Sequence, residues 1–325
     1  MSLRFLKLGA VALTALVLAG STGFAAETLI MGTTGRGSAQ QWPIFIADQK
    51  GYFAENNVKM DLVSAPSSAA VIQQLTAGSI NLGSGGLADP LRAIDKGAPI
   101  TLLRVETQVP PYSVWGKKDL KSIKDLKGKL ISIGGIKDIT RIYLERMLGP
   151  NGVAPGQYDL VFAGTTAARF AALAAGAVDA AILVPPFTFK AEGEGYSNLG
   201  ALSDYEKKLP FTGYAVNTTW AKAHKPALVG FLKGVAKGID WFNDPANRTQ
   251  AIDILVKESG STRSDIEMTY DYYTKIKIFD RIGLVGSSEV KTLAEAMKSI
   301  GDLEGSTDVA RFADPEIVEL AKQVK

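Results

Sequence analysis

The chain has 325 residues, 46% of them hydrophobic and 21% charged, which is the composition of a globular protein of about two domains. Its 36 basic and 33 acidic residues nearly balance, which excludes the basic footprint of a nucleic-acid-binding protein. The absence of cysteine excludes thiol chemistry and disulfides, and one histidine, His224, is too few for a zinc site of the His/Cys type. We expect no metal and no cofactor, and we interpret His224 as a surface residue.

Residues 1–25 are typical of a secretory signal peptide. Arg4 and Lys7 provide a positive start, residues 8–18 are an apolar run, and small residues lead to a predicted cleavage site after Ala25. The run is shorter than the roughly 20 residues of a membrane-spanning helix. No cysteine follows it, so no lipid anchor is expected. The sequence therefore predicts an exported, periplasmic protein.

The remaining elements alternate between strands and helices, which predicts two α/β lobes with largely parallel sheets. The strands are predicted at 28–34, 60–65, 80–82, 101–106, 129–133, 159–163, 180–184 and 211–217. The helices are predicted at 43–50, 68–77, 139–148, 166–175, 220–223, 226–243, 248–259, 263–275, 288–300 and 315–322. Residues 26–107 with 214–325 are expected to form lobe 1 and residues 108–213 lobe 2, and the C-terminal helices are expected to cover lobe 1. Two chain crossings would then form a hinge.

An internal repeat supports this division. Residues 61–80 and 159–178 are identical at nine of twenty positions at an offset of 98. Each copy is predicted to be a strand, a hydroxyl cap, a helix that ends at glycine, and a second strand, which is a βαβ unit. Chance similarity between alanine-rich helices is the alternative, but it would not place the caps and the glycine in one register.

Ligands of open parallel sheets bind outside the carboxyl ends of the strands, where five loops are predicted here at 34–41, 65–68, 84–87, 136–141 and 184–187. Helix N-termini in these loops suit an anion. Arg36 and Arg141 follow a strand in each half and would either clamp that anion or be solvated surface charges. Trp42, Phe187 and Tyr214 would either form an apolar wall or belong to the core.

Several segments carry a family resemblance: PIFIA at 43–47, KGYF at 50–53, LTAGSINLG at 75–83, IKDLKGK at 123–129, AGAVDAA at 175–181 and PP at 185–186. In their order and spacing they resemble the periplasmic substrate-binding proteins of nitrate/sulfonate/taurine-type (NitT/TauT family) ABC importers. That group includes the thiamine-pyrimidine binding proteins. The resemblance spans essentially the whole chain after the signal peptide.

The resemblance implies a type II periplasmic binding protein fold, with two α/β lobes, a two-crossing hinge and a ligand enclosed between the lobes. Together with the loop positions, it implies a ligand site made of Thr34, Gly35, Arg36, Ser38, Gln41, Trp42, Ser67, Ser84, Gly85, Gly86, Leu87, Thr107, Gln108, Ile136, Lys137, Asp138, Thr140, Arg141, Val184, Pro185, Phe187 and Tyr214.

The function expected from this resemblance is that of a monomeric, non-enzymatic solute-binding component. It would capture a small organic anion such as a sulfonate or carboxylate and deliver it to a membrane permease. One alternative is an enzyme of the same fold, a thiamine-pyrimidine synthase acting on pyridoxal phosphate, for which Lys137 is the candidate lysine. The chain lacks the Cys-rich or His-containing signature of those synthases. Another alternative is a sensor that presents its ligand to a membrane receptor.

Overall fold

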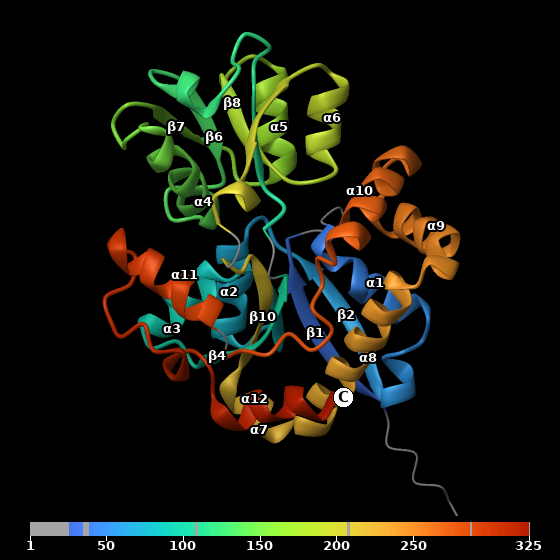
Figure 1. Ribbon diagram of the computed structural model, residues 1–325. Helices are drawn as coiled ribbons and strands as arrows, with labels where there is room; N and C mark the ends of the chain where they lie inside the picture. Colours follow the sequence, from blue (N-terminus) through green and yellow to red (C-terminus); the bar gives the residue numbers. More distant parts are fainter. Residues whose placement is uncertain (1–25, 35–38, 108–109, 207–208, 287, 325) are drawn as a thin grey trace, which may run out of the picture.

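The computed structural model describes residues 26–34, 39–107, 110–206, 209–286 and 288–324. It shows two α/β lobes, as the sequence predicts, and each lobe is built on a five-stranded mixed sheet (Figure 1). The signal peptide predicted at 1–25 lies outside the described residues. No helix within the described ranges is both long and apolar enough to cross a membrane.

The sheet of lobe 1 has the strand order β2-β1-β3-β10-β4. Its strands are β1 (Glu27–Thr33), β2 (Val58–Ser64), β3 (Leu82–Gly86), β4 (Ile100–Thr107) and β10 (Thr212–Asn217). Strand β1 pairs in parallel with β2 and β3, whereas β10 runs antiparallel to both β3 and β4. The predicted parallel sheet therefore has one reversed strand.

The sheet of lobe 2 repeats this order as β7-β6-β8-β5-β9. Its strands are β5 (Ser113–Gly116), β6 (Leu130–Ile133), β7 (Asp159–Phe162), β8 (Ala180–Leu183) and β9 (Ser197–Ala201). Here β5 is the reversed strand, antiparallel to β8 and β9. In each lobe the reversed strand is the first one after the chain has crossed from the other lobe, from β4 to β5 and from β9 to β10.

The predicted repeat is present in atomic detail. Helix α2 (Ser68–Ala77) is capped by the Ser67 hydroxyl and α5 (Thr166–Ala174) by the Thr165 hydroxyl, 98 residues later. The residues after the repeated helices also correspond. Asn81 accepts a hydrogen bond from a backbone N–H of β1 (2.9 Å), and Asp179 accepts one from β6 (3.0 Å). Both copies thus fasten their second strand to the first strand of the same lobe's βαβ core, β3 to β1 and β8 to β6.

The other helices of lobe 1 are α1 (Trp42–Gln49), α3 (Ala88–Asp95), α7 (Thr218–Ala223), α8 (Lys225–Asn243), α9 (Arg248–Ser259), α10 (Arg263–Ile276), α11 (Ser288–Ser299) and α12 (Pro315–Ala321). Helices α1 and α8 pack on one face of the sheet, and α2, α3 and α11 lie on the other (Figure 1). Lobe 2 has α4 (Ile139–Leu148), α5 and α6 (Phe187–Gly193).

The C-terminal helices cover lobe 1 as predicted, but α10 also reaches lobe 2, where it lies beside α6 (Figure 1). The Lys190 Nζ of α6 is 3.2 Å from Asp265 Oδ2 of α10, and the rings of Phe189 and Tyr272 meet edge to face at 6.2 Å. These contacts close one side of the space between the lobes.

A second set of contacts joins the lobes on the opposite side. Arg92 of α3 pairs with Asp89 and Asp302 and donates to the backbone oxygen of Lys137 in lobe 2. The Lys137 ammonium is 3.9 Å from Asp302. With polar contacts between the lobes on both sides, the structure represents a closed arrangement.

Candidate functional site

A cavity of about 370 Å³ lies between the lobes, at the carboxyl ends of the strands. This volume is at the small end of the range for ligand pockets, so it suits a small molecule. Lobe 1 contributes Thr34, Ala39, Gln40, Gln41, Pro66, Ser67, Ser68, Gly85, Gly86, Thr212 and Ser261, and lobe 2 contributes Tyr112, Gly134, Asp138, Ile139, Gly164, Thr165, Thr166, Ala167, Arg169, Val184, Pro185, Pro186, Phe187 and Lys190, with Phe211 between the lobes.

Three helices start at the wall of this cavity. The caps of α2, α4 and α5 are Ser67, Asp138 and Thr165, and all three line it. The first turn of a helix has N–H groups without intrahelical partners and carries a partial positive charge. The Asp138 carboxylate already meets the end of α4, whereas the caps of α2 and α5 are uncharged hydroxyls. Because these two ends converge here, the cavity favours a negatively charged group.

Arg169 adds a full positive charge to the lobe 2 wall. Its side chain is fixed because Nε donates to the Ile182 carbonyl (2.8 Å), Nη1 to the Gly164 carbonyl (2.5 Å) and Nη2 to the Thr166 hydroxyl (2.7 Å). The residue is only 3% exposed, and no carboxylate in the described part of the chain pairs with it. A buried charge without a counter-charge is unfavourable, so this guanidinium favours binding of an anion.

Two other charged side chains line the cavity, and each is already engaged. Lys190 pairs with Asp265 and lies over the Phe187 ring, 5.2 Å from its centroid. Asp138 caps α4, and its Oδ1 accepts from the Thr140 backbone N–H (2.8 Å) and hydroxyl (2.5 Å). Arg169 is therefore the cation in the described wall whose charge is not compensated.

The lobe 1 wall is polar but uncharged. Gln41, which is 2% exposed, ends the single helical turn Ala39–Gln41, and its Nε2 donates to the Ser84 hydroxyl (2.9 Å). Its Oε1 is buried and has no hydrogen-bond donor among the described residues. A buried acceptor without a partner is costly, so this oxygen favours a ligand that can donate.

Apolar and aromatic groups complete the wall. Tyr112 packs edge to face on Phe211, with their centroids 4.8 Å apart, while Phe187, Ile139 and Val184 face the same cavity. Burial raises the pKa of Tyr112 above its usual 10.0, and the positive charge of Arg169 only partly opposes this. The Tyr112 hydroxyl is therefore a neutral donor at physiological pH. These walls suit a ligand with an apolar body.

The structure brings nine of the predicted site residues to the cavity: Thr34, Gln41, Ser67, Gly85, Gly86, Asp138, Val184, Pro185 and Phe187. Four others, Gly35, Arg36, Ser38 and Gln108, lie outside the described residues. No group of three or more potential metal ligands occurs within the described ranges. The ligand-binding role of the nine residues remains a prediction.

The predicted aromatic wall is corrected at two positions, because Trp42 and Tyr214 belong to the core of lobe 1. Trp42 is buried between Phe242 and Tyr273, at centroid distances of 6.2 and 5.7 Å. Tyr214 is fully buried on β10, where its hydroxyl donates to Glu106. Both rings fill space between the sheet and the helices that cover it. Of the three predicted aromatic residues, only Phe187 reaches the cavity.

The other predicted site residues that need correction do not line the cavity, because they lie either outside it or buried behind its wall. Arg141 pairs with Glu145 one turn along α4 (2.8 Å), so its guanidinium is not part of the cavity. Ile136 and Lys137 are exposed, with the Lys137 side chain 62% accessible. Four further residues are buried behind the wall and pack or bond within their own lobes: Ser84, Leu87, Thr107 and Thr140.

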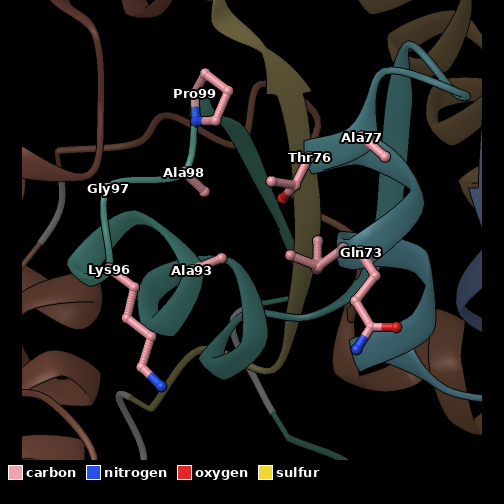
Figure 2. A pocket seen from close by; sticks show the side chains of 9 residues that line it. Gln73, Thr76, Ala77, Ala93, Lys96, Gly97, Ala98 and Pro99 are labelled. Carbon is pink, nitrogen blue, oxygen red and sulfur yellow. The ribbon is translucent and has the colours of Figure 1, made fainter.

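A larger hollow of about 560 Å³ lies on the outer surface of lobe 1, between α2 and α3 (Figure 2). Figure 2 shows that its lining is mostly small side chains such as Ala77 and Ala93, with Lys96 as the charged residue. The lining comes from the C-terminal halves of both helices, where the partial charge is negative. This hollow therefore suits an anion less well than the cavity between the lobes.

Two α/β lobes of the same topology, crossed twice by the chain and enclosing a cavity at the carboxyl ends of their strands, define a periplasmic binding protein fold. The model of the family described as "NMT1/THI5 like" matches residues 38–248, more than half of the sequence. The chain belongs to this family.

Among curated proteins, the chain is similar to the 4-amino-5-hydroxymethyl-2-methylpyrimidine phosphate synthase THI12 of Saccharomyces cerevisiae. The two are 27% identical over 143 residues, which are 43% of this chain and 41% of the relative. The chain thus spans about two fifths of the length of that synthase.

Among solved structures, the chain is similar to the aliphatic sulphonate binding protein SsuA of Escherichia coli. The TM-score is 0.73 at 20% identity, over 90% of this chain and 99% of SsuA. It is also similar to the nitrate-binding protein NrtA of Synechocystis, with a TM-score of 0.76 at 16% identity over 92% of this chain and 89% of NrtA. These likenesses show the fold, which agrees with the predicted NitT/TauT-type binding protein.

Proposed function

We propose that this protein is the solute-binding component of an ABC importer and that it captures a small organic anion between its two lobes. The observation that carries the proposal is Arg169, a buried guanidinium without a carboxylate partner, in a cavity onto which three helix N-termini converge. Its fold neighbours SsuA and NrtA, which are a sulphonate-binding and a nitrate-binding protein, support the same ligand class.

The mechanism follows from the position of the cavity. Each lobe supplies only part of its wall, so a ligand makes all its contacts only when the lobes are closed. Binding therefore shifts the population from open to closed, by an amount set by the difference in affinity between the two states. A membrane permease that recognises the closed form would then distinguish loaded from empty protein, and residues 1–25 would direct the chain to the periplasm.

A thermal-shift screen of sulfonates, carboxylates and neutral analogues tests the binding role, because a ligand that binds only the folded state raises its melting temperature. We expect hits among organic anions. Small-angle X-ray scattering with the strongest hit should show a smaller radius of gyration than without it. A screen without hits in any class, or a hit that leaves the radius unchanged, would refute the proposal.

A pyrimidine synthase is the second candidate function, because curated relatives bear that name. A pyridoxal phosphate imine would need a lysine with an unpaired amine. Lys137, the candidate from the sequence, is exposed outside the cavity, and Lys190 in the cavity wall is ion-paired with Asp265. The described residues therefore fit this cofactor poorly. An absorbance band of a lysine-bound imine in the purified protein, removed by Lys190→Ala, would favour the enzyme.

A further inference from the structure

The cavity is chemically asymmetric between the lobes. All three charged side chains of its described wall, Arg169, Lys190 and Asp138, come from lobe 2. Lobe 1 supplies hydroxyls, glycines and the amide of Gln41. A ligand held between these walls meets charge on one side and neutral hydrogen-bonding groups on the other.

From this asymmetry we infer that the ligand is an organic acid with one acidic group and a separate N–H or O–H donor. Arg169 of lobe 2 binds the acidic group, and Gln41 Oε1 of lobe 1 accepts from the donor. The inference rests on the proposed solute-binding function and adds the ligand class and the residues that select it.

The acidic group is assigned to Arg169 because the geometry there is fixed before the ligand arrives. Three backbone or side-chain oxygens of lobe 2 hold the guanidinium, and they come from Gly164, Thr166 and Ile182. The same segment begins α5, whose first-turn N–H groups are directed toward the cavity wall. Lys190 is the weaker candidate because Asp265 already neutralises it.

The donor is assigned to Gln41 because its amide has one satisfied end and one unsatisfied end. Nε2 is held by the Ser84 hydroxyl, which is fully buried behind the wall, and this contact fixes the plane of the amide. Oε1 is buried without a donor among the described residues. A site built to hydrogen-bond one polar group of a ligand rejects an analogue that lacks that group, because its own polar atom then stays unpaired.

Asp138 limits the ligand to one acidic group. Its carboxylate lies in the same lobe 2 wall as Arg169, and no cation of the described chain pairs with it. A second acidic group on the ligand would meet this negative charge or the uncharged wall of lobe 1. Diacids should therefore bind more weakly than the matched acid with a donor.

Isothermal titration calorimetry with matched probes tests the inference. Three carbon skeletons are used: ethane, butane and benzene. Each is tested as four compounds, namely the carboxylic acid, the acid with an added amino group, the amine alone and the diacid. For the skeleton that binds best, we expect the acid with a donor to exceed the plain acid by about tenfold, and the amine alone not to bind. Tighter binding by an amine or a diacid would overturn the inference.

Two variants separate the two assignments. Gln41→Met should abolish the tenfold preference for the acid with a donor over the plain acid. Arg169→Lys, which keeps the charge but loses the planar fork, should weaken every acid at least tenfold and keep the preference. A purely structural role of Gln41 would lower the affinities of both acids by the same factor and so keep their ratio. If Gln41→Met keeps the preference, or Arg169→Lys binds acids normally, the assignment fails.

The inference and the proposed function fail in different ways. If the broader thermal-shift screen finds only diacids, the proposed capture of an organic anion stands and the assignment of an acid with a donor is wrong. If it finds only neutral ligands, the protein still binds a solute, but both the anion class and the assignment are wrong. If neither the screen nor the probes give any binding, both are wrong.

Discussion

Glu106 provides a test of the buried polar network near the crossing between the lobes. It lies on β4, is fully buried and accepts a hydrogen bond from the Tyr214 hydroxyl. Burial raises the pKa of Glu106 from 4.5 to about 7, although the Arg104 charge and the tyrosine hydrogen bond oppose this. The folded protein therefore keeps a proton that the unfolded chain releases. Replacing Glu106 by glutamine removes this titration and preserves the shape of the side chain.

The magnitude follows from linkage. Between pH 4.5 and 7 the folded state binds more protons than the unfolded state, so the free energy of unfolding falls as the pH rises and levels off above 7. Each pH unit contributes about 1.4 kcal/mol, which gives about 3 kcal/mol over the interval. Glu106→Gln should match the parent protein near pH 4.5 and exceed its stability by about 3 kcal/mol at pH 8.

Urea denaturation from pH 4.5 to 8 measures this difference. Glu55→Gln is the control, because Glu55 is exposed and pairs with the exposed Lys237, so its replacement should leave the pH profile unchanged. Equal pH profiles for Glu106→Gln and the parent protein, or a variant that is less stable at pH 8, would refute the reasoning.

Three further predictions concern the repeat, a tight glycine and the closed state. Asp179→Ala should lower the free energy of unfolding in urea by roughly 1–3 kcal/mol, because the backbone N–H of Leu130 loses its acceptor. Asp179→Asn keeps an acceptor oxygen and loses only the ion pair with Lys117, so it should cost under about 1 kcal/mol. Equal losses in the two variants would contradict this. Gly283→Ala should lower the free energy of unfolding by roughly 2–5 kcal/mol, and Gly260→Ala by only about 1 kcal/mol. Both glycines have a positive φ (+61° and +67°), but a Cβ at Gly283 would lie 2.1 Å from the Val105 carbonyl oxygen, whereas a Cβ at Gly260 would meet no atom within 4 Å. Equal melting temperatures of the two variants would be evidence against this. Lys190→Met removes an ion pair between the lobes and should raise the radius of gyration of the ligand-free protein, and an unchanged radius would show that this pair does not hold the lobes.

The sequence predicts most of the fold because its local signals agree with the tertiary structure. The Ser67 and Thr165 caps, the left-handed glycines that follow both helices, and the side chains of Asn81 and Asp179 recur at one offset and occupy equivalent places. The short elements β5, β9, α3 and α6 are not predictable from these local signals. Each is eight residues or fewer, so neither the helical nor the strand period repeats often enough to be recognised.

The sequence predicts which loops form the site, but it does not predict which side chains line it. The loops after the strands do line the cavity, since the topology alone places them there. Arg141 follows a strand and is a candidate anion clamp or a surface charge in the sequence, and its ion pair with Glu145 holds it on the side of α4. Arg169 is not among the predicted site residues, although in the second copy of the repeat it occupies the position that Val71, a fully buried core residue, occupies in the first. A charge at an inward-facing position of an alanine-rich helix was the signal in the sequence.

A crystal structure of the protein with the strongest acid from the screen tests the central claim most directly. We predict the acidic group against the Arg169 guanidinium and the start of α5, with the lobes closed over the ligand. A ligand in the hollow between α2 and α3, or one in the cavity with its acidic group away from Arg169, would contradict the account.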